Sequence, residues 1–214
     1  MPAYSDTTIG MTLKVYIDYK SPYAYLAKDP IYDLARDTGV TIDWLPYTLD
    51  VPAFLGSAAV DIHGTVLEQN RNPHQWRRVR YAYMDARREG NRRGLTIRGP
   101  RKIFDSTLAN VGLLYAKRQN AVRAYNDKVF TRFWARELDI EDRVAMTVVL
   151  RDVGADVTGF EAFADGEGRE ELLRIQKAAE AAGVFGVPSF VLENGELFWG
   201  REHLPRLREI LAAR

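Results

Sequence analysis

The stretch that decides the fold is residues 13–26, LKVYIDYKSPYAYL. Its first part, 13–19, alternates β-branched or aromatic residues with polar ones, which is the pattern of a β-strand. The Ser21-Pro22 pair that follows predicts a helix start, because a serine side chain accepts backbone N–H groups and proline suits the first helical position. The strand and the helix therefore join directly at Ser21, and we expect the helix to end at Gly39.

Residues 40–46, VTIDWLP, predict a second strand, so the chain opens with a βαβ unit whose strands pair in parallel. The long stretch 61–167 differs, because its apolar residues recur at helical spacing and no convincing strand is visible. We therefore expect an all-α insertion there. Two of its predicted helices carry the apolar stripes Leu108, Val111, Leu114 and Tyr115, and Val122, Tyr125, Val129, Phe130 and Phe133.

The C-terminal part predicts a helix, a hairpin and a last helix. Residues 170–182 have strong helical character and stop before Gly183. An Asn-Gly pair then separates the apolar runs 189–192 and 197–199, which predicts two antiparallel strands joined by a tight turn. A final helix is expected over about 202–212.

The predicted order, βαβ, helical insertion, then αββα, is that of a thioredoxin-like α/β fold with a large insert. On this basis residues 12–60 and 168–214 make up the thioredoxin-like domain, and residues 61–167 make up the inserted helical domain.

The composition excludes several kinds of chemistry. The chain has 214 residues, 46% of them hydrophobic, no cysteine, and a formal net charge of +1. It can therefore bury a core without disulfides, and it has no cysteine nucleophile, thiolate metal site or dithiol redox pair of its own. The three histidines are scattered without the spacing of a metal site, so we expect no metal.

No apolar run is long enough to span a membrane, which takes about 18 residues. Residues 1–10 lack the basic and apolar regions of an export signal, so we interpret them as a short disordered lead-in. The expected setting is a soluble protein in the cytoplasm, where small thiols are abundant.

Ser21 and Pro188 are the two residues most informative about chemistry. The N–H groups and the positive dipole end at a helix N-terminus would stabilise an anion or thiolate beside Ser21, although Ser21 could also serve only as an N-cap. A proline that opens a strand is either an edge device or a cis turn. In a thioredoxin-like layout a cis Val187–Pro188 bond would offer strand-like hydrogen bonds to a peptide-like ligand at the Ser21 site.

The sequence resembles the 2-hydroxychromene-2-carboxylate isomerases and the related kappa-class glutathione transferases, which belong to the DsbA-like branch of the thioredoxin superfamily. The stretches that carry the resemblance are YIDYKSPYAYL at 16–26, GVFGVPSF at 183–190 and LFWGREHL at 197–204. The resemblance implies a thioredoxin-like fold of the DsbA/kappa type. It also implies that Ser21 replaces the first cysteine of the DsbA-type CxxC motif, so that the reacting sulfur comes from glutathione.

For the site, the resemblance implies that Ser21 is catalytic and donates its hydroxyl hydrogen bond to the glutathione sulfur. The glutathione-binding residues that it implies are Ser21, Pro22, Tyr23, Val187, Pro188, Arg201 and Glu202. Arg201-Glu202 departs from the family, which usually has an aspartate in this motif, and Glu202 could instead be a favourable acid in the first turn of the last helix. The family's glutathione contact after the second strand has no clear equivalent in residues 50–59.

The reaction implied by the resemblance is a glutathione-dependent isomerisation of a small aromatic acid. The thiolate adds to the conjugated system, the ring opens, a former double bond rotates, and the thiolate leaves. A kappa-like glutathione transferase and a non-catalytic thioredoxin-like module that binds peptides are the alternatives. The resemblance further implies a homodimer.

A strongly basic segment, residues 71–102, carries eleven Lys and Arg residues against two acidic ones. Interleaved aromatic residues would suit nucleic acid. A solvated helical face, steering of an anionic substrate and contact with a dimer partner also explain the charge, and we favour these over nucleic acid.

Overall fold

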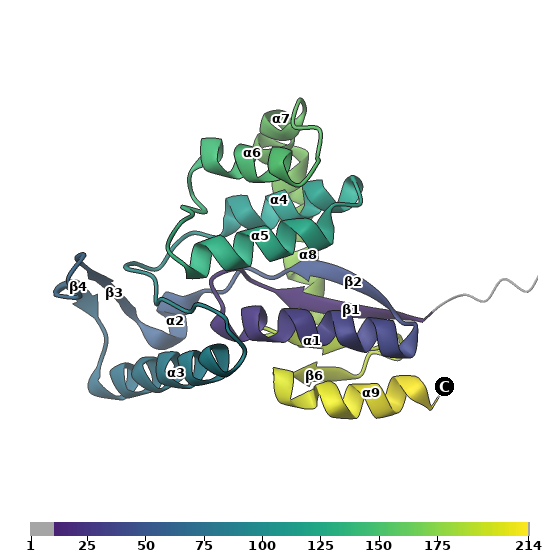
Figure 1. Cartoon of the computed structure of the whole chain (residues 1–214), viewed down its shortest axis with the longest axis horizontal. Coiled ribbons are helices and arrows are strands. Elements are labelled where there is room, and N and C mark those ends of the chain that lie inside the picture. The colour runs from purple at the N-terminus through teal and green to yellow at the C-terminus, as the bar shows by residue number, and fades with distance from the viewer. Residues whose placement is uncertain (1–10, 214) are drawn as a thin grey trace, which may run out of the picture.

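The computed structural model describes residues 11–213 and has a four-stranded mixed sheet at its centre (Figure 1). The predicted lead-in at 1–10 lies outside the described residues. The strand order is β2-β1-β5-β6, in which β1 and β2 run parallel and the other neighbours run antiparallel. The strands are β1 (Thr12–Ile17), β2 (Thr41–Pro46), β5 (Ser189–Val191) and β6 (Leu197–Trp199).

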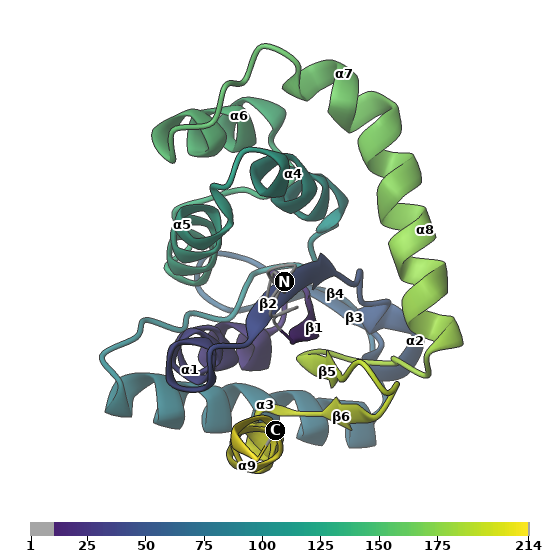
Figure 2. The same ribbon diagram turned by 90° about the vertical axis from the view of Figure 1, so that its right-hand side faces the viewer.

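Helix α1 (Pro22–Thr38) begins and ends where the sequence predicts. Ser21 is its N-cap, and Gly39 follows it with φ of 73°, a left-handed conformation that glycine adopts without strain. Helix α9 (Leu204–Ala212) packs against α1 and is preceded by a short 3₁₀ turn, Arg201–His203. Helix α8 (Glu167–Ala181) lies on the opposite side of the sheet from α1 (Figure 2). The thioredoxin-like α/β fold is therefore confirmed.

The segment between β2 and α8 corrects one prediction. The predicted all-α insertion at 61–167 is wrong in one part, because β4 (Val66–Asn70) lies in it and forms a β-hairpin with β3 (Ser57–Val60), which directly precedes it. The strands escaped detection because β4 is exposed, β3 is only partly buried, and their register shifts at a bulge, so they lack a regular apolar alternation. The helices of this segment are α2 (Val51–Leu55), α3 (Pro73–Arg92), α4 (Thr107–Arg118), α5 (Val122–Trp134), α6 (Arg143–Asp152) and α7 (Phe160–Asp165).

The aromatic residues of α5 join this segment to the sheet. Tyr125, Phe130 and Trp134 are fully buried, so the apolar stripe predicted here is core. The indole N–H of Trp134 donates to the carbonyl oxygen of Tyr19 at 3.1 Å, and the Tyr19 hydroxyl donates to Asn126 at 2.6 Å. These contacts fix the chain directly before Ser21, because Tyr19 lies between β1 and α1. Within residues 11–213, no helix has both the length and the apolar character needed to cross a bilayer.

Candidate active site

Ser21 lies at the point where the first strand delivers the chain to the N-terminus of α1. Its side-chain oxygen accepts the N–H of Ala24 at 3.2 Å, which confirms the predicted N-cap. The same oxygen lies 3.5 Å from the carbonyl oxygen of Val187, to which the hydroxyl donates. The residue is only 5% exposed. The Ser21 side chain therefore both caps α1 and contacts Val187.

The Val187–Pro188 peptide bond is cis and lies beside this helix N-terminus, which decides between the edge device and the cis turn that the sequence left open. The turn is held from both sides. The Ser189 hydroxyl donates to the carbonyl oxygen of Gly186 at 2.7 Å, and the N–H of Gly200 donates to the carbonyl oxygen of Pro188 at 2.9 Å. The N–H of Val187 makes no hydrogen bond to any residue of the described chain, so it can pair with a ligand.

A cavity of about 880 Å³ opens beside Ser21. Ser21, Pro22, Tyr23 and Val187, four of the predicted site residues, contribute to its lining. At its rim Phe185 and Trp199, which are 61% and 49% exposed, pack with their ring centroids 4.9 Å apart. Such exposed rings offer an apolar contact surface for an aromatic ligand.

The far wall of the cavity comes from the inserted segment and is strongly cationic. Among the described residues, the lining of the whole cavity includes eight basic side chains and no aspartate or glutamate, and seven of the eight come from the inserted segment. They are Lys20, Arg71, Arg78, Arg80, Arg87, Arg101, Lys102 and Arg136. Much of the basic segment 71–102 therefore faces the cavity, where it favours an anionic ligand. The sequence predicts the basic segment but not the cavity that it lines.

A buried ion pair, which sequence reasoning missed, supports the Ser21 turn. Asp18 is fully buried, and its carboxylate lies 3.7 Å from the ammonium group of Lys20. It also accepts the N–H of Leu49 at 2.8 Å, while its own carbonyl oxygen accepts the N–H of Ser21. Burial raises the pKa of Asp18, and Lys20 and the Leu49 N–H oppose that rise. An acidic residue inside an apolar strand pattern was the signal that could have identified it.

Tyr23 links the start of α1 to α3. Its hydroxyl donates to the carboxylate of Asp85 at 3.3 Å. Burial raises the pKa of Tyr23 to about 12, and the nearby Asp85 adds to the rise, so the hydroxyl keeps its proton at neutral pH. Tyr23 therefore acts as a hydrogen-bond donor at the edge of the cavity.

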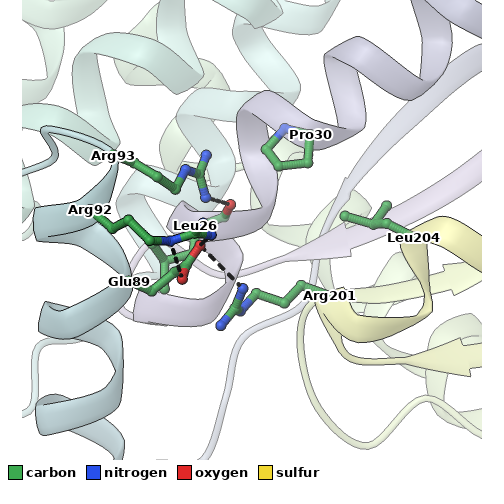
Figure 3. Close-up of a pocket in the computed structure, with 7 residues that line it drawn as sticks. All are labelled: Leu26, Pro30, Glu89, Arg92, Arg93, Arg201 and Leu204. Carbon is green, nitrogen blue, oxygen red and sulfur yellow. Dashed lines mark hydrogen bonds and ion pairs between the residues drawn. The ribbon is translucent and has the colours of Figure 1, made fainter.

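Arg201 and Glu202 are absent from the lining of this cavity. Arg201 lines a second pocket, of about 440 Å³, where it lies 3.7 Å from Glu89 (Figure 3). Arg92 and Arg93 line the same pocket. Glu202 is exposed and its carboxylate folds over Gly200, where a Cβ atom would lie 2.4 Å from it. Arg201 and Glu202 thus lie at the start of the C-terminal helical segment, outside the lining that contains Ser21.

The parallel β1-α1-β2 unit, the hairpin with its final helix, and the cis proline beside the N-terminus of α1 define a thioredoxin-like protein. Comparison with known families makes this specific, because the profile of the DSBA-like thioredoxin domain matches residues 12–212. The chain belongs to this DsbA-like family, in the branch that contains the 2-hydroxychromene-2-carboxylate isomerases.

Individual relatives agree. The 2-hydroxychromene-2-carboxylate isomerase of Sphingobium xenophagum is 27% identical over 94% of this chain and 97% of its own. The isomerase of the same name from Pseudomonas putida is 30% identical, over 91% of both chains. A solved structure of a 2-hydroxychromene-2-carboxylate isomerase superposes with a TM-score of 0.72 at 24% identity, over 95% of both chains. The cytosolic disulfide reductase DsbM from Pseudomonas aeruginosa, solved with GSH, has a TM-score of 0.63 at 16% identity over 94% of this chain and 98% of its own.

Proposed function

We propose that the protein is a glutathione-dependent isomerase of the 2-hydroxychromene-2-carboxylate type. The observation that carries the proposal is the position of the Ser21 hydroxyl at a helix N-terminus, 3.5 Å from the Val187 carbonyl oxygen, in a cavity with a cationic wall. Relatives of similar length are named as isomerases of this substrate. An isomerisation involves no net oxidation, which suits a chain that has no cysteine.

The residues present fit glutathione. A bound glutathione would supply the sulfur nucleophile that the chain itself lacks. The Ser21 hydroxyl would donate to that sulfur, and the N-terminus of α1 would favour its negative charge. The unpaired Val187 N–H and its carbonyl group would pair with the ligand's main chain as a neighbouring strand does. The structural neighbour DsbM has been solved with GSH in the same fold.

The remaining groups would orient the aromatic substrate. Phe185 and Trp199 at the rim provide apolar contact for its ring, and the arginine side chains of the far wall attract its carboxylate. Pro22 and Tyr23 close the cavity beside the sulfur position. Arg201 and Glu202 are proposed to contact glutathione away from its sulfur, because they follow the β6 strand that neighbours the Val187 turn.

Two alternatives rest on specific features. The size and openness of an 880 Å³ cavity favour a kappa-like glutathione transferase that accepts varied electrophiles. The unpaired Val187 N–H favours a non-catalytic module that binds an extended peptide.

One set of assays separates the three functions. The protein is incubated with a 2-hydroxychromene-2-carboxylate and with a chlorinated nitrobenzene, each with and without glutathione, while absorbance is followed. An isomerase converts the first compound and requires glutathione, and a transferase conjugates the second. If neither compound reacts and calorimetry detects no glutathione binding, the proposed function is wrong and the peptide-binding module is favoured.

A further inference from the structure

Three arginines of the cavity wall are held in a common manner. Arg71, Arg87 and Arg136 each donate from Nε to a backbone carbonyl oxygen, which orients the guanidinium group. Arg136 also donates from one terminal nitrogen to the same acceptor, so it keeps one terminal nitrogen for another partner, whereas Arg71 and Arg87 keep two. Within residues 11–213 none of the three pairs with a carboxylate. The acceptors are Leu55 at 3.0 Å, Tyr83 at 3.0 Å and Gly99 at 2.8 Å, respectively. We call these three arginines, together with the side chain of Tyr83, the arginine subsite.

Tyr83 supplies a neutral donor among these charges. The Tyr83 ring packs against Gly99, where a Cβ atom would be 3.4 Å from it. Because the carbonyl oxygen of Gly99 holds Arg136, Tyr83 and Arg136 contact the same residue. The Tyr83 hydroxyl makes no hydrogen bond to the described chain. Burial raises the pKa of Tyr83 to about 12 against the opposing effect of the three arginines, so the hydroxyl remains a donor at neutral pH.

The backbone at Arg136 is unfavourable for an arginine. Arg136 follows the C-cap of α5 with φ of 62°, the left-handed region that glycine favours at this position of a helix end. Burial, together with repulsion from Arg101, Arg98 and Arg87, lowers the pKa of Arg136. Arg136 is thus held at the cavity wall against both its backbone preference and its charge preference, which points to a role in binding.

The charges exceed what one carboxylate requires. Of the eight basic side chains in the lining, Lys20 and Lys102 pair with Asp18 and Glu141, respectively. The other six are arginines that pair with no carboxylate of the described chain. The N-terminus of α1 would face the thiolate, and the first carboxylate of the substrate would have Arg78, Arg80 and Arg101 of the same wall. The arginine subsite is therefore a separate source of positive charge on the inserted wall.

We propose that the arginine subsite binds a second carboxylate of the substrate, so that the substrate is an aromatic dicarboxylate with anionic groups at two ends. This inference rests on the proposed function, which places the reaction at Ser21. It adds that the substrate carries two anionic groups and is long enough to reach the arginine subsite. The three guanidinium groups and the phenol of the arginine subsite supply donors for the two oxygens of a carboxylate.

The test compares binding of 2-naphthoate and naphthalene-2,6-dicarboxylate, which share one ring system and differ by one anionic group. Affinities are measured by calorimetry for the wild type, Arg136→Gly and Arg77→Gln. Arg77 lies on α3, the helix that carries Arg87, is exposed and is absent from the cavity lining, so its substitution controls for long-range charge. Arg136→Gly suits the left-handed backbone and should fold at least as well as the wild type.

We expect the wild type and Arg77→Gln to bind the dicarboxylate about tenfold more tightly than the monocarboxylate, and Arg136→Gly to lose most of that preference. Equal affinities in the wild type, a preference retained in Arg136→Gly, an equal loss in both variants, or binding of neither probe would overturn the proposal. The measurement needs neither glutathione nor turnover. Failure of the isomerase assay with a retained dicarboxylate preference would therefore count against the proposed function alone.

Discussion

The Ser21 hydroxyl lies 3.5 Å from the carbonyl oxygen of Val187, although the two residues are 166 positions apart in the chain. Because the same oxygen accepts the N–H of Ala24, Ser21 connects the N-terminus of α1 to the cis-proline turn. A thiol that entered between these two elements would meet a hydroxyl donor, a helix N-terminus and an unpaired backbone N–H. This relationship is the structural basis of the first prediction.

Replacing Ser21 with alanine should lower kcat/KM for glutathione-dependent isomerisation by about 10²-fold, the usual effect of losing one preorganised donor to a developing negative charge. Ser21→Thr keeps both the hydroxyl and the capping oxygen and should retain most of the activity. Steady-state kinetics of the two variants measures the difference. Equal activity of Ser21→Ala and the wild type would contradict a catalytic role for the hydroxyl.

Stability should depend on pH through Asp18. Burial raises its pKa above the ordinary value of 3.8, so between 3.8 and the raised value the folded protein holds a proton that the unfolded chain releases. The contribution of Asp18 to stability is therefore full below that window and is lost as pH rises through it. As pH rises through this window, the free energy of unfolding of the wild type should fall relative to that of Asp18→Asn. Denaturant unfolding of both proteins across this range measures the difference. A difference that stays constant would show that the carboxyl titrates normally.

The close approach of α4 and α5 makes Gly112 intolerant of a side chain. A Cβ atom there would lie 2.1 Å from the hydroxyl oxygen of Tyr125, which donates to the carbonyl oxygen of Ala109 at 2.8 Å. Gly112→Ala should reduce the free energy of unfolding by about 3 kcal/mol. The double variant Gly112→Ala/Tyr125→Phe should lose less free energy of unfolding than the sum of the two single losses, because the clash with the hydroxyl is removed. Strict additivity in urea denaturation would contradict this packing.

The N-terminus of α3 is fixed by a capping box. Asn72 accepts the N–H of Gln75 at 2.9 Å, and the Gln75 side chain accepts the N–H of Asn72 at 2.9 Å. Asn72→Ala should lower the free energy of unfolding by about 1 kcal/mol, whereas Asn72→Asp should not. Thermal unfolding of both variants checks this, and equal melting temperatures for the two would show that the cap contributes nothing.

The parts of the fold that could be predicted are those with short-range signals. Ser21-Pro22 and Gly39 mark both ends of α1, and a proline at the start of a strand limits Pro188 to an edge device or to the cis turn that the structure has. Such residues act through their own backbone conformation or capping, so no distant contact is needed to interpret them. The same holds for the C-terminal hairpin, where an Asn-Gly pair lies between two apolar runs.

The cavity wall could not be predicted, because it is assembled from distant segments. Arg71 precedes α3, Arg87 lies within it, and Arg136 follows α5, and only packing brings them to one cavity. Arg136 also adopts a left-handed backbone that sequence patterns assign to glycine. The β3–β4 hairpin was missed for a related reason, since its strands, one partly buried and one exposed, bury no regular face.

The most direct measurement of the central claim is the pKa of the thiol of glutathione bound to the protein, followed by thiolate ultraviolet absorbance in a pH titration. In the wild type this pKa should lie below that of free glutathione, because the Ser21 hydroxyl and the N-terminus of α1 favour the thiolate. In Ser21→Ala it should move back toward the free value. Absence of glutathione binding, or a bound thiol with the pKa of free glutathione, would contradict the claim that this site holds an external thiolate.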